Sequence, residues 1–449
     1  MSKYFGTDGF RGEANAGLTV EHAFSIGRFL GWYYGKENKA RIAIGKDTRI
    51  SGDMYESALA AGITASGADA YLLRVVSTPG LAYATRNGDF ECGVMISASH
   101  NPFHDNGIKL INRDGEKMEE SVIEAIEKYL DSDLIAERAT GDSIGRVIEY
   151  PEGVEAYERF LIKSCPVRMD GIRIALDCAN GSASRIAPGV FSALGASIEV
   201  LNADPDGINI NAGCGSTHMK ALKDFVRENR MDAGFAFDGD ADRCLGVDEN
   251  GDTLDGDMAL YICAKFLKQK GEFGSDSVVT TVMANLGLYK ALDAIGISYE
   301  TTDVGDKYVY ENMKANGHML GGEQSGHTIF SKYATTGDGV LTALQLMRVY
   351  VESGESFSSL KSDVRIYPQL LKNVSVTDKD AALNCSEVTE TCARIETALG
   401  GNGRILLRKS GTEPVLRIMV EASTDEICED CANAIIAAMD KAGMLIEIK

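Results

Sequence analysis

The stretch Arg41-Ile-Ala-Ile-Gly-Lys-Asp-Thr-Arg49 begins a pattern that the chain repeats: an apolar strand, a polar turn and then a helix. Ile172-Arg-Ile-Ala-Leu-Asp-Cys-Ala-Asn-Gly-Ser182 and Ser277-Val-Val-Thr-Thr-Val-Met-Ala-Asn285 begin the second and third copies. Strands that alternate with helices of this length predict crossover units in mixed or parallel sheets. The sequence therefore predicts three similar α/β domains.

The remaining C-terminal segment reads as a smaller α+β domain. Three junctions separate the parts: Ile148-Glu-Tyr-Pro-Glu-Gly153, the Asn250-Gly251 turn inside a predicted hairpin, and Tyr367-Pro368. We expect the four domains to cover residues 1–150, 151–252, 253–366 and 367–449.

Composition and charge exclude several classes of protein. The 449 residues are 44% hydrophobic and 25% charged, which is typical of a soluble globular chain. The net charge of −21 repels nucleic acid and anionic membranes, and no basic block offsets it. The N-terminus has no signal-peptide pattern, and no run approaches the ~18 apolar residues of a membrane span. These features predict a cytoplasmic protein with neither nucleic-acid nor membrane partners.

The ten cysteines are scattered, and a cytoplasmic location predicts that they stay reduced. Cys428 and Cys431 form the one CxxC pair, within a predicted amphipathic helix. A zinc knuckle would need a second pair, so we expect two small core residues on one helix face.

The loop Ser97-Ala-Ser99-His100-Asn101-Pro102 follows an apolar strand. A serine hydroxyl at a strand end can act as a nucleophile or carry a phosphate, although a capped turn would look the same. His100 and His104 have the spacing of a helical zinc pair, but Pro102 between them argues against a helix.

Asp238, Asp240 and Asp242 alternate on a loop directly after another apolar strand. Such charge density is unfavourable without a cation, and carboxylate oxygens suit Mg²⁺ or Ca²⁺. A calcium-loop pattern fails because Arg243 stands where glycine is required. The sequence favours a catalytic Mg²⁺ site over a solvated acidic turn.

Two further loops carry polar groups beside glycines. Gly321-Gly-Glu323-Gln-Ser325-Gly-His327 offers paired hydrogen bonds to vicinal sugar hydroxyls, or is simply a polar turn. Arg408-Lys-Ser410-Gly411-Thr412-Glu-Pro414 combines cations, hydroxyls and a turning glycine, as a phosphate site requires, or is a basic surface turn. The nucleotide-binding patterns GxxxxGK[ST] and GxGxxG are absent from the sequence.

Taken in order, these loops resemble those of the α-D-phosphohexomutase family. The matching motifs span nearly the whole chain: Phe5-Gly-Thr-Asp-Gly-Phe-Arg11-Gly12, Ser97-Ala-Ser99-His-Asn-Pro102, Asp238-Gly-Asp-Ala-Asp-Arg243, Gly322-Glu-Gln-Ser-Gly-His327 and Arg408-Lys-Ser-Gly-Thr-Glu-Pro414. Gly322–His327, Arg408–Pro414 and Val304-Gly-Asp-Lys-Tyr-Val309 resemble the branch that acts on glucosamine phosphates. The branch that acts on mannose phosphates usually shows Val-Gly-His and Ser-Asn-Thr. Ala241 departs from the glycine common in the glucosamine branch.

The resemblance implies four domains around a central cleft and a phosphoserine at Ser99. It implies interconversion of glucosamine 6-phosphate and glucosamine 1-phosphate through a bisphosphorylated sugar, for UDP-N-acetylglucosamine and bacterial cell-wall precursors. One Mg²⁺ per active site and a sugar bisphosphate, or an equivalent primer that phosphorylates Ser99, are the implied cofactors.

The roles of individual residues follow from the matched motifs and are grouped by function. Ser99, Asp238, Asp240 and Asp242 would hold the metal, while Arg11, Lys109 and Arg243 would offset charge around Ser99, and Lys109 or His100 would move protons. Substrate binding would fall to Glu323, Ser325, His327, Arg408, Ser410, Gly411, Thr412 and Arg417.

Several alternatives stay open at this point. The chain could belong to a branch that acts on mannose or glucose phosphates, be a Mg²⁺-dependent sugar phosphatase built on Asp238, or be a sugar-phosphate sensor without catalysis. The partner would be a small hexosamine phosphate, and both a monomer and a homodimer are compatible with the sequence.

Overall fold

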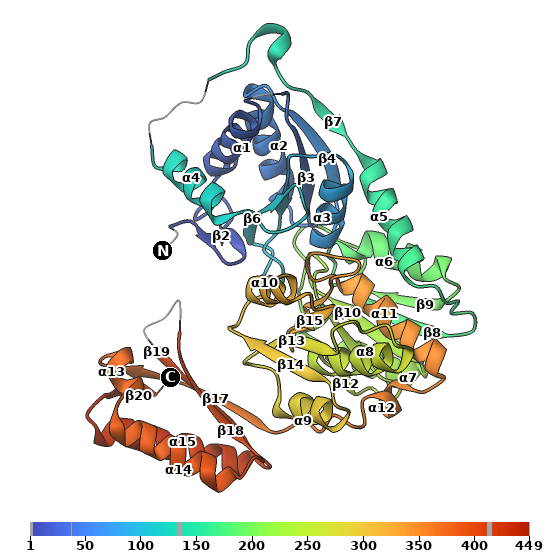
Figure 1. The fold of residues 1–449 in the computed structure, drawn as a ribbon. Helices are drawn as coiled ribbons and strands as arrows, with labels where there is room; N and C mark the ends of the chain where they lie inside the picture. The colour runs from blue at the N-terminus through green and yellow to red at the C-terminus, as the bar shows by residue number, and fades with distance from the viewer. Residues whose placement is uncertain (1–2, 37, 133–136, 411–414, 449) are drawn as a thin grey trace. The chain divides into compact units, whose positions relative to one another are not determined.

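A computed structural model describes residues 3–36, 38–132, 137–410 and 415–448. These residues form two compact units, and each is described by itself: 1–283 with 297–362, and 284–296 with 363–449. The first unit holds three mixed sheets, and the second holds an antiparallel sheet (Figure 1). None of the helices in the described ranges is long and apolar enough to cross a membrane.

The first sheet has seven strands in the order β1-β2-β6-β5-β3-β4-β7. Its helices are α1, α2, α3 and α4, and α1 and α2 pack closely against each other. The strands are β1 (Phe5–Gly6), β2 (Gly9–Glu13), β3 (Arg41–Lys46), β4 (Asp69–Val75), β5 (Cys92–Ile96), β6 (Asp105–Asn112) and β7 (Val147–Glu149). The helices are α1 (Val20–Tyr34), α2 (Gly52–Ala65), α3 (Thr78–Asn87) and α4 (Glu120–Leu130), with a 3₁₀ turn at Gly141–Ser143.

The second and third sheets follow in sequence within the same unit. The second, in the order β12-β11-β10-β8-β9, comprises β8 (Arg173–Asp177), β9 (Ser197–Leu201), β10 (Ala233–Phe237), β11 (Cys244–Val247) and β12 (Thr253–Leu254). Its helices are α5 (Pro151–Ser164), α6 (Ala183–Ala193) and α7 (Lys220–Asn229), with a 3₁₀ turn at Gly215–Thr217. The third, in the order β14-β13-β15-β16, comprises β13 (Ser277–Thr281), β14 (Ser298–Thr302), β15 (Leu320–Gly322) and β16 (Thr328–Phe330). Its helices are α8 (Gly256–Lys270), α10 (Asp306–Asn316), α11 (Gly339–Ser353) and α12 (Phe357–Leu360).

The three sheets share a four-strand core. In each core three parallel strands are followed by one antiparallel strand: β6-β5-β3-β4, β11-β10-β8-β9 and β16-β15-β13-β14. The strands predicted to begin the three copies are β3, β8 and β13, which occupy the same place in each core. The prediction of three similar α/β domains is confirmed, and so is the hairpin at Asn250-Gly251, which joins β11 to β12. The boundaries after 150, 252 and 366 stay predictions; β12 lies just beyond the middle one.

The buried strands explain why helices lie on these sheets. All five residues of β5, β10 and β13 are buried, so these central strands need cover on both faces. Two of these helices begin with an aspartate cap: Asp255 accepts a hydrogen bond from the Met258 N–H at α8, and Asp338 accepts one from the Leu341 N–H at α11.

The C-terminal unit is an antiparallel sheet in the order β18-β19-β17-β20, packed against helices. Its strands are β17 (Gln369–Val376), β18 (Arg404–Lys409), β19 (Val415–Glu421) and β20 (Leu445–Ile448), and its helices are α13 (Lys379–Leu383), α14 (Ser386–Leu399) and α15 (Asp425–Lys441). The unit also contains α9 (Leu286–Ala294), which follows β13 in the chain. Cys428 is buried in the core of this unit, and the partly buried Cys431 packs against that core, as predicted for the CxxC pair.

Glu421 joins α9 to this antiparallel sheet. Its buried carboxylate accepts hydrogen bonds from the Leu286 N–H at 3.0 Å, from Asn285 Nδ2 at 3.2 Å, from Gln369 Nε2 at 2.9 Å and from Arg404 Nε at 2.5 Å. One carboxylate therefore accepts hydrogen bonds both from an N–H at the start of α9 and from the Arg404 guanidinium.

We expect Glu421→Ala to destabilise the C-terminal unit by about 3–5 kcal/mol, because it leaves the Arg404 guanidinium and the Leu286 N–H without their carboxylate. Hydrogen exchange of the β17–β19 amides should become faster by roughly a hundredfold or more. Glu429→Ala is the control, because it breaks an ion pair between Lys372 and a half-exposed Glu429 in the same unit and should cost less than about 1 kcal/mol. Equal exchange rates in the two variants would contradict the role of Glu421.

Candidate functional site

Three of the predicted loops leave the carboxyl ends of parallel strands in the first unit. The Ser99 loop follows β5, the Asp238 loop follows β10, and the Glu323 loop follows β15. Strand ends of this kind are where α/β proteins bind their ligands, because main-chain groups and loop side chains gather there.

The Ser99 hydroxyl lies against the acidic loop. Ser99 Oγ donates a hydrogen bond to Asp238 Oδ2 at 2.6 Å, and His100 Nδ1 lies 3.3 Å from Ser99 Oγ. Ser99 is buried at 1% exposure, so its hydroxyl is directed into the protein rather than displayed on a surface turn. The loop is also a capped turn, because Ser97 Oγ accepts a hydrogen bond from the Ser99 N–H at 2.9 Å.

The loops after β5 and β10 approach each other closely at Gly239. A Cβ at this position would lie 2.5 Å from the main-chain oxygen of Ser99 and 3.0 Å from Asn211 Nδ2. No L side chain fits there, so glycine is required for the contact. Ala241, two residues on, has φ +55°. This left-handed conformation costs a non-glycine residue roughly 1–2 kcal/mol, which explains why glycine is the common residue at this position.

The three aspartates form one cluster whose side-chain oxygens can meet. One ligand oxygen from each of Asp238, Asp240 and Asp242 lies within 4.8 Å of the others, and all three residues are buried. Asp240 Oδ1 and Asp242 Oδ1 are buried and accept no hydrogen bond from the part of the chain that the structure describes. A hard divalent cation would satisfy both orphaned oxygens, so the donor set fits Mg²⁺.

The three carboxylates are not electrostatically equivalent. Burial, together with the carboxylates of Asp242 and Asp240, raises the pKa of Asp238 well above its usual range. Burial would also raise the pKa of Asp240, but Lys109 and the Thr78 hydroxyl lower it to about 2. The cluster therefore holds an anion at Asp240 and disfavours one at Asp238 until positive charge arrives.

Lys109 supplies the compensating charge from β6. Its ammonium lies 2.7 Å from Asp240 Oδ2, 3.5 Å from Asp242 Oδ2 and 3.8 Å from Asp8 Oδ1. Burial alone would lower the pKa of Lys109, but Asp240 and Asp8 raise it, so the group stays protonated. Lys109 pairs with Met95 across the sheet, which places it beside the strand that leads to Ser99.

Arg243, Arg11 and His100 lie around the same cluster. The Arg243 N–H donates to Asp238 Oδ1 at 3.2 Å, and its Nε is 3.8 Å from Asp242 Oδ1. Arg11 pairs with Asp8. Burial lowers the pKa of His100, and the positive charges of Arg243 and Arg11 lower it further, so the imidazole is neutral.

The loop after β15 joins the acidic loop directly. The Cys244 N–H, just after Arg243, donates to the Gly326 carbonyl at 3.0 Å. Glu323 Oε1 accepts from the Gly305 N–H at 3.2 Å, while Ser325 is exposed. His327 is buried at 3% exposure, and its Nε2 accepts from the Gly337 N–H at 3.2 Å. Glu323, Gln324 and Ser325 are thus the accessible side chains of this loop, whereas the His327 ring is buried.

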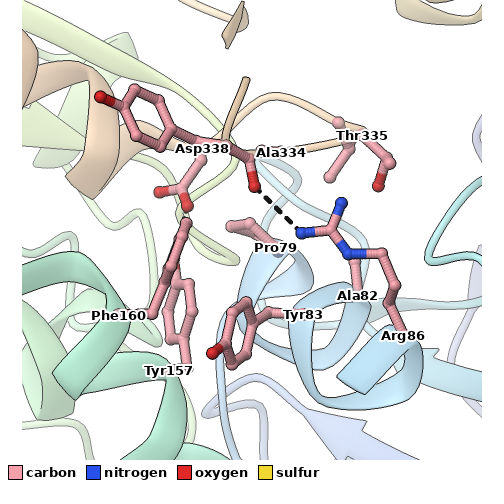
Figure 2. A pocket seen from close by; sticks show the side chains of 11 residues that line it. Pro79, Ala82, Tyr83, Arg86, Tyr157, Phe160, Ala334, Thr335 and Asp338 are labelled. Carbon is pink, nitrogen blue, oxygen red and sulfur yellow. Dashed lines mark hydrogen bonds between the residues drawn. The ribbon is translucent and has the colours of Figure 1, made fainter. Parts of the chain in front are cut away.

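The first residue of helix α11 contacts the acidic loop. The Gly339 N–H donates to the Ala241 carbonyl at 3.0 Å, and Asp338, which caps this helix, accepts from the Tyr157 hydroxyl at 2.7 Å. Figure 2 shows the small pocket beside Asp338, with the rings of Tyr83, Tyr157 and Phe160 along one side and Arg86 on the other. Both oxygens of Asp338 are engaged in hydrogen bonds, so the pocket reads as packing between domains and not as the reacting site.

Arg408, Ser410 and Arg417 belong to the C-terminal unit. Arg408 on β18 and Arg417 on β19 are direct cross-strand partners, and both are half-buried. The pair places two guanidinium groups side by side on the sheet, and guanidinium groups can bind phosphate bidentately. Gly411 and Thr412 lie outside the described residues.

Sequence reasoning missed five residues of the site: Asp8, Asp47, Arg49, Thr78 and Asn211. Asp47-Thr-Arg49 follows β3 as Ser97-Ala-Ser99 follows the neighbouring strand β5, and this parallel could have drawn attention to it. Asp8 stood within a quoted motif, whereas Thr78 and Asn211 gave no signal, because they reach the site from distant parts of the chain.

Comparison with known proteins assigns the chain to a family. Four profiles described as phosphoglucomutase/phosphomannomutase match it: alpha/beta/alpha domain I at residues 2–135, domain II at 150–251, domain III at 255–367 and the C-terminal domain at 371–438. A protein named phosphoglucosamine mutase from Lachnoclostridium phytofermentans is 55% identical over 444 residues, 99% of each chain. Another of that name from Lachnospira eligens is 56% identical over 450 residues, 99% of this chain and 100% of the relative.

Solved structures share the fold at low sequence identity. A phosphoglucomutase/phosphomannomutase family protein from Burkholderia thailandensis has a TM-score of 0.80 at 23% identity, over 99% of this chain and 98% of its own. The N-acetylphosphoglucosamine mutase of Aspergillus fumigatus, solved in complex with GlcNAc-6P and magnesium, has a TM-score of 0.68 at 19% identity, over 99% and 96%. With all four domain types present in order, the chain belongs to the phosphoglucomutase/phosphomannomutase family, the α-D-phosphohexomutases that its loop motifs resemble.

Proposed function

We propose that this chain is an isomerase that interconverts glucosamine 6-phosphate and glucosamine 1-phosphate through a phosphoserine at Ser99 and a bisphosphorylated sugar. The observation that carries the proposal is the contact between Ser99 Oγ and the cluster of three aspartates, at 2.6 Å. The choice of sugar rests on the two relatives above 50% identity that are named phosphoglucosamine mutase.

The proposed mechanism is a reversible phosphoryl transfer. A hydroxyl of the substrate attacks the phosphorus on Ser99, an O–P bond to the sugar forms, and the bond from phosphorus to Ser99 Oγ breaks. The proton lost by the substrate hydroxyl is balanced by a proton gained at Ser99 Oγ. The sugar bisphosphate turns around and returns its other phosphate to Ser99. A sugar bisphosphate from solution would load the enzyme for its first cycle.

Asp238, Asp240 and Asp242, with an oxygen of phosphorylated Ser99, would hold one Mg²⁺. When bound, this ion neutralises charge on the transferring phosphoryl group. Lys109 holds Asp240 in its anionic form and offsets charge near Ser99. His100 is neutral and has a nitrogen 3.3 Å from Ser99 Oγ, so it is placed to exchange a proton at that oxygen.

Glu323 and Ser325 would bind the ring hydroxyls in either orientation of the sugar. Arg408 and Arg417, with Ser410, Gly411 and Thr412, would bind the phosphate that is not being transferred. We assign one loop to each proposed domain, 1–150, 151–252, 253–366 and 367–449. Ten unpaired cysteines fit a reducing compartment, and we propose the cytoplasm.

Phosphorus NMR on a panel of hexose and hexosamine phosphates, with Mg²⁺ and a bisphosphate primer, tests the reaction. We expect glucosamine phosphates to interconvert with a higher kcat/KM than glucose or mannose phosphates, and Ser99→Ala to lose nearly all turnover together with the phosphate that peptide mass spectrometry finds at Ser99. Release of inorganic phosphate without isomerisation would indicate a phosphatase instead. A phosphate found on Ser97 would disprove the role of Ser99.

The acidic cluster yields a second prediction, in which two similar substitutions diverge. Asp238→Asn and Asp240→Asn should each weaken Mg²⁺ binding at least about tenfold, since loss of even an indirect partner of a metal costs that much. Charge crowding alone would predict that both stabilise the metal-free protein. For Asp240→Asn we expect the opposite effect on stability, because the substitution removes the charge that pairs with Lys109, whose ammonium lies 2.7 Å from Asp240 Oδ2.

Without metal, Asp238→Asn should leave the free energy of unfolding unchanged or higher, because it removes a carboxylate whose ionisation is unfavourable. Asp240→Asn should lower the free energy of unfolding by about 2 kcal/mol. This loss is smaller than the usual cost of a broken buried ion pair, because Asp242 and Asp8 still face Lys109. Calorimetric Mg²⁺ titration and urea unfolding in chelator measure the two effects. Full activity in excess chelator would contradict the metal assignment.

The cross-strand arginines yield a third prediction. Either end of the bisphosphate must dock at the C-terminal loop, so Arg408→Ala should raise KM for both substrates by about 10- to 100-fold, the worth of a charge-assisted contact. It should also release free bisphosphate during turnover and steepen the need for primer. Lys409→Ala is the matched control, because it removes the same charge from the opposite face of β18. A normal KM without leakage in Arg408→Ala would exclude phosphate binding at this loop.

A further inference from the structure

The backbone of Ser99 adopts a conformation that it would not hold alone. Its φ is +51°, in the left-handed region that non-glycine residues avoid at a cost of roughly 1–2 kcal/mol. Such strain persists only where surrounding contacts impose it. The contacts that impose it here are buried and come from two other segments of the chain.

Arg49 makes the larger set of contacts. Its guanidinium has five N–H donors, and Nε donates to Asp47 Oδ2 at 2.8 Å. The terminal nitrogens donate to four main-chain carbonyls, three in the loop after β5 and one at the start of β6: Ser99 O at 2.8 Å, Asn101 O at 2.8 Å, Pro102 O, and Asp105 O at 3.0 Å. A lysine has three donors on a single atom and cannot reproduce this planar fork.

Asp47 joins this guanidinium to the amide side of the same loop. Its Oδ2 also accepts from Ser97 Oγ at 2.6 Å, and Ser97 Oγ accepts from the Ser99 N–H at 2.9 Å. The side chains of Asp47 and Arg49 are 0% exposed, so the pair is fully desolvated. The carbonyl and the N–H of Ser99 are thus both fixed by one connected network.

Asn211, in the second α/β domain, donates hydrogen bonds to the loop that carries Ser99. Its Nδ2 donates to Ser99 O at 2.9 Å and to Asn101 O at 3.1 Å, the same two carbonyls that Arg49 Nη2 binds. Asn211 is buried at 8% exposure. The loop that carries Ser99 is therefore held between two domains at the point where it meets the Asp238 loop.

We propose that Arg49, Asp47 and Asn211 are positioning residues for the nucleophile, which hold Ser99 in its left-handed backbone so that Oγ faces Asp238. None of the three touches Ser99 Oγ, so they act through the main chain. Relaxation of the backbone at Ser99 would swing its oxygen away from the acidic cluster, and a misplacement of about 1 Å can cost a hundredfold in rate. The inference rests on the proposed role of Ser99.

Two pairs of variants test it. Arg49→Lys keeps the positive charge but loses the planar set of guanidinium donors. Its control is Arg28→Lys, because Arg28 is also a buried arginine of the first domain and donates to the Ala65 carbonyl at 2.9 Å. Asn211→Gly removes the amide without backbone strain, because Asn211 has φ +58°; its control is Asn15→Gly, an exposed residue at φ +61°.

The measurements are kcat and KM for glucosamine phosphates, the rate at which glucose 1,6-bisphosphate phosphorylates the dephosphorylated enzyme at Ser99, and thermal unfolding. We expect Arg49→Lys and Asn211→Gly to lower kcat and the phosphorylation rate by about 10- to 100-fold with KM within about twofold, and both controls to match the wild type in rate. If Arg49→Lys fails to fold, Asn211→Gly decides alone. Wild-type rates in a folded Asn211→Gly, or equal losses in the controls, would overturn the inference. Isomerisation by a wild type whose Ser99 is never phosphorylated would instead overturn the proposed function, and the inference with it.

Discussion

The burial of negative charge beside Ser99 is the constraint on which the rest of the structure depends. Asp238, Asp240 and Asp242 lie together out of solvent, and Lys109 compensates only part of their charge. A cluster of this kind is unfavourable in a folded protein unless it receives a cation. Residues from distant parts of the chain contact this cluster: Thr78 and Lys109 donate hydrogen bonds to Asp240, and Ser99 donates one to Asp238.

The repeated four-strand core explains how distant residues reach that point. In each copy the parallel strands end at one edge of the sheet, and each copy contributes a loop there: after β5, after β10 and after β15. The strand that pairs antiparallel at the edge, β6 in the first copy, turns back beside the same loop and brings Lys109 with it. A single architecture, used three times, thus positions the loops of Ser99, of the three aspartates and of Glu323.

Close packing between the loops fixes their relative geometry. Glycine at position 239 leaves room for the Ser99 carbonyl, and the Gly339 N–H donates a hydrogen bond to the Ala241 carbonyl. Two non-glycine residues, Ser99 and Ala241, hold left-handed backbones within this contact. The strain is concentrated where phosphoryl transfer would take place, as is common where a site must be rigid before its substrate arrives.

The sequence by itself determined the class of fold, the three copies and most of the loops, because apolar periodicity and the polar residues that interrupt it are local properties. It also predicted functional roles for Ser99, as a hydroxyl at a strand end, and for the three aspartates, since crowded carboxylates after a buried strand are costly without a cation. Only the tertiary structure showed that Asp240 is paired with Lys109 while Asp238 is not, that His327 is buried, and that Arg49 and Asn211 bind the main chain of Ser99. The contacts of Lys109, Arg49 and Asn211 join segments separated by 50 to more than 130 residues, and no local pattern encodes which side chain will meet a given carbonyl or carboxylate across such a distance.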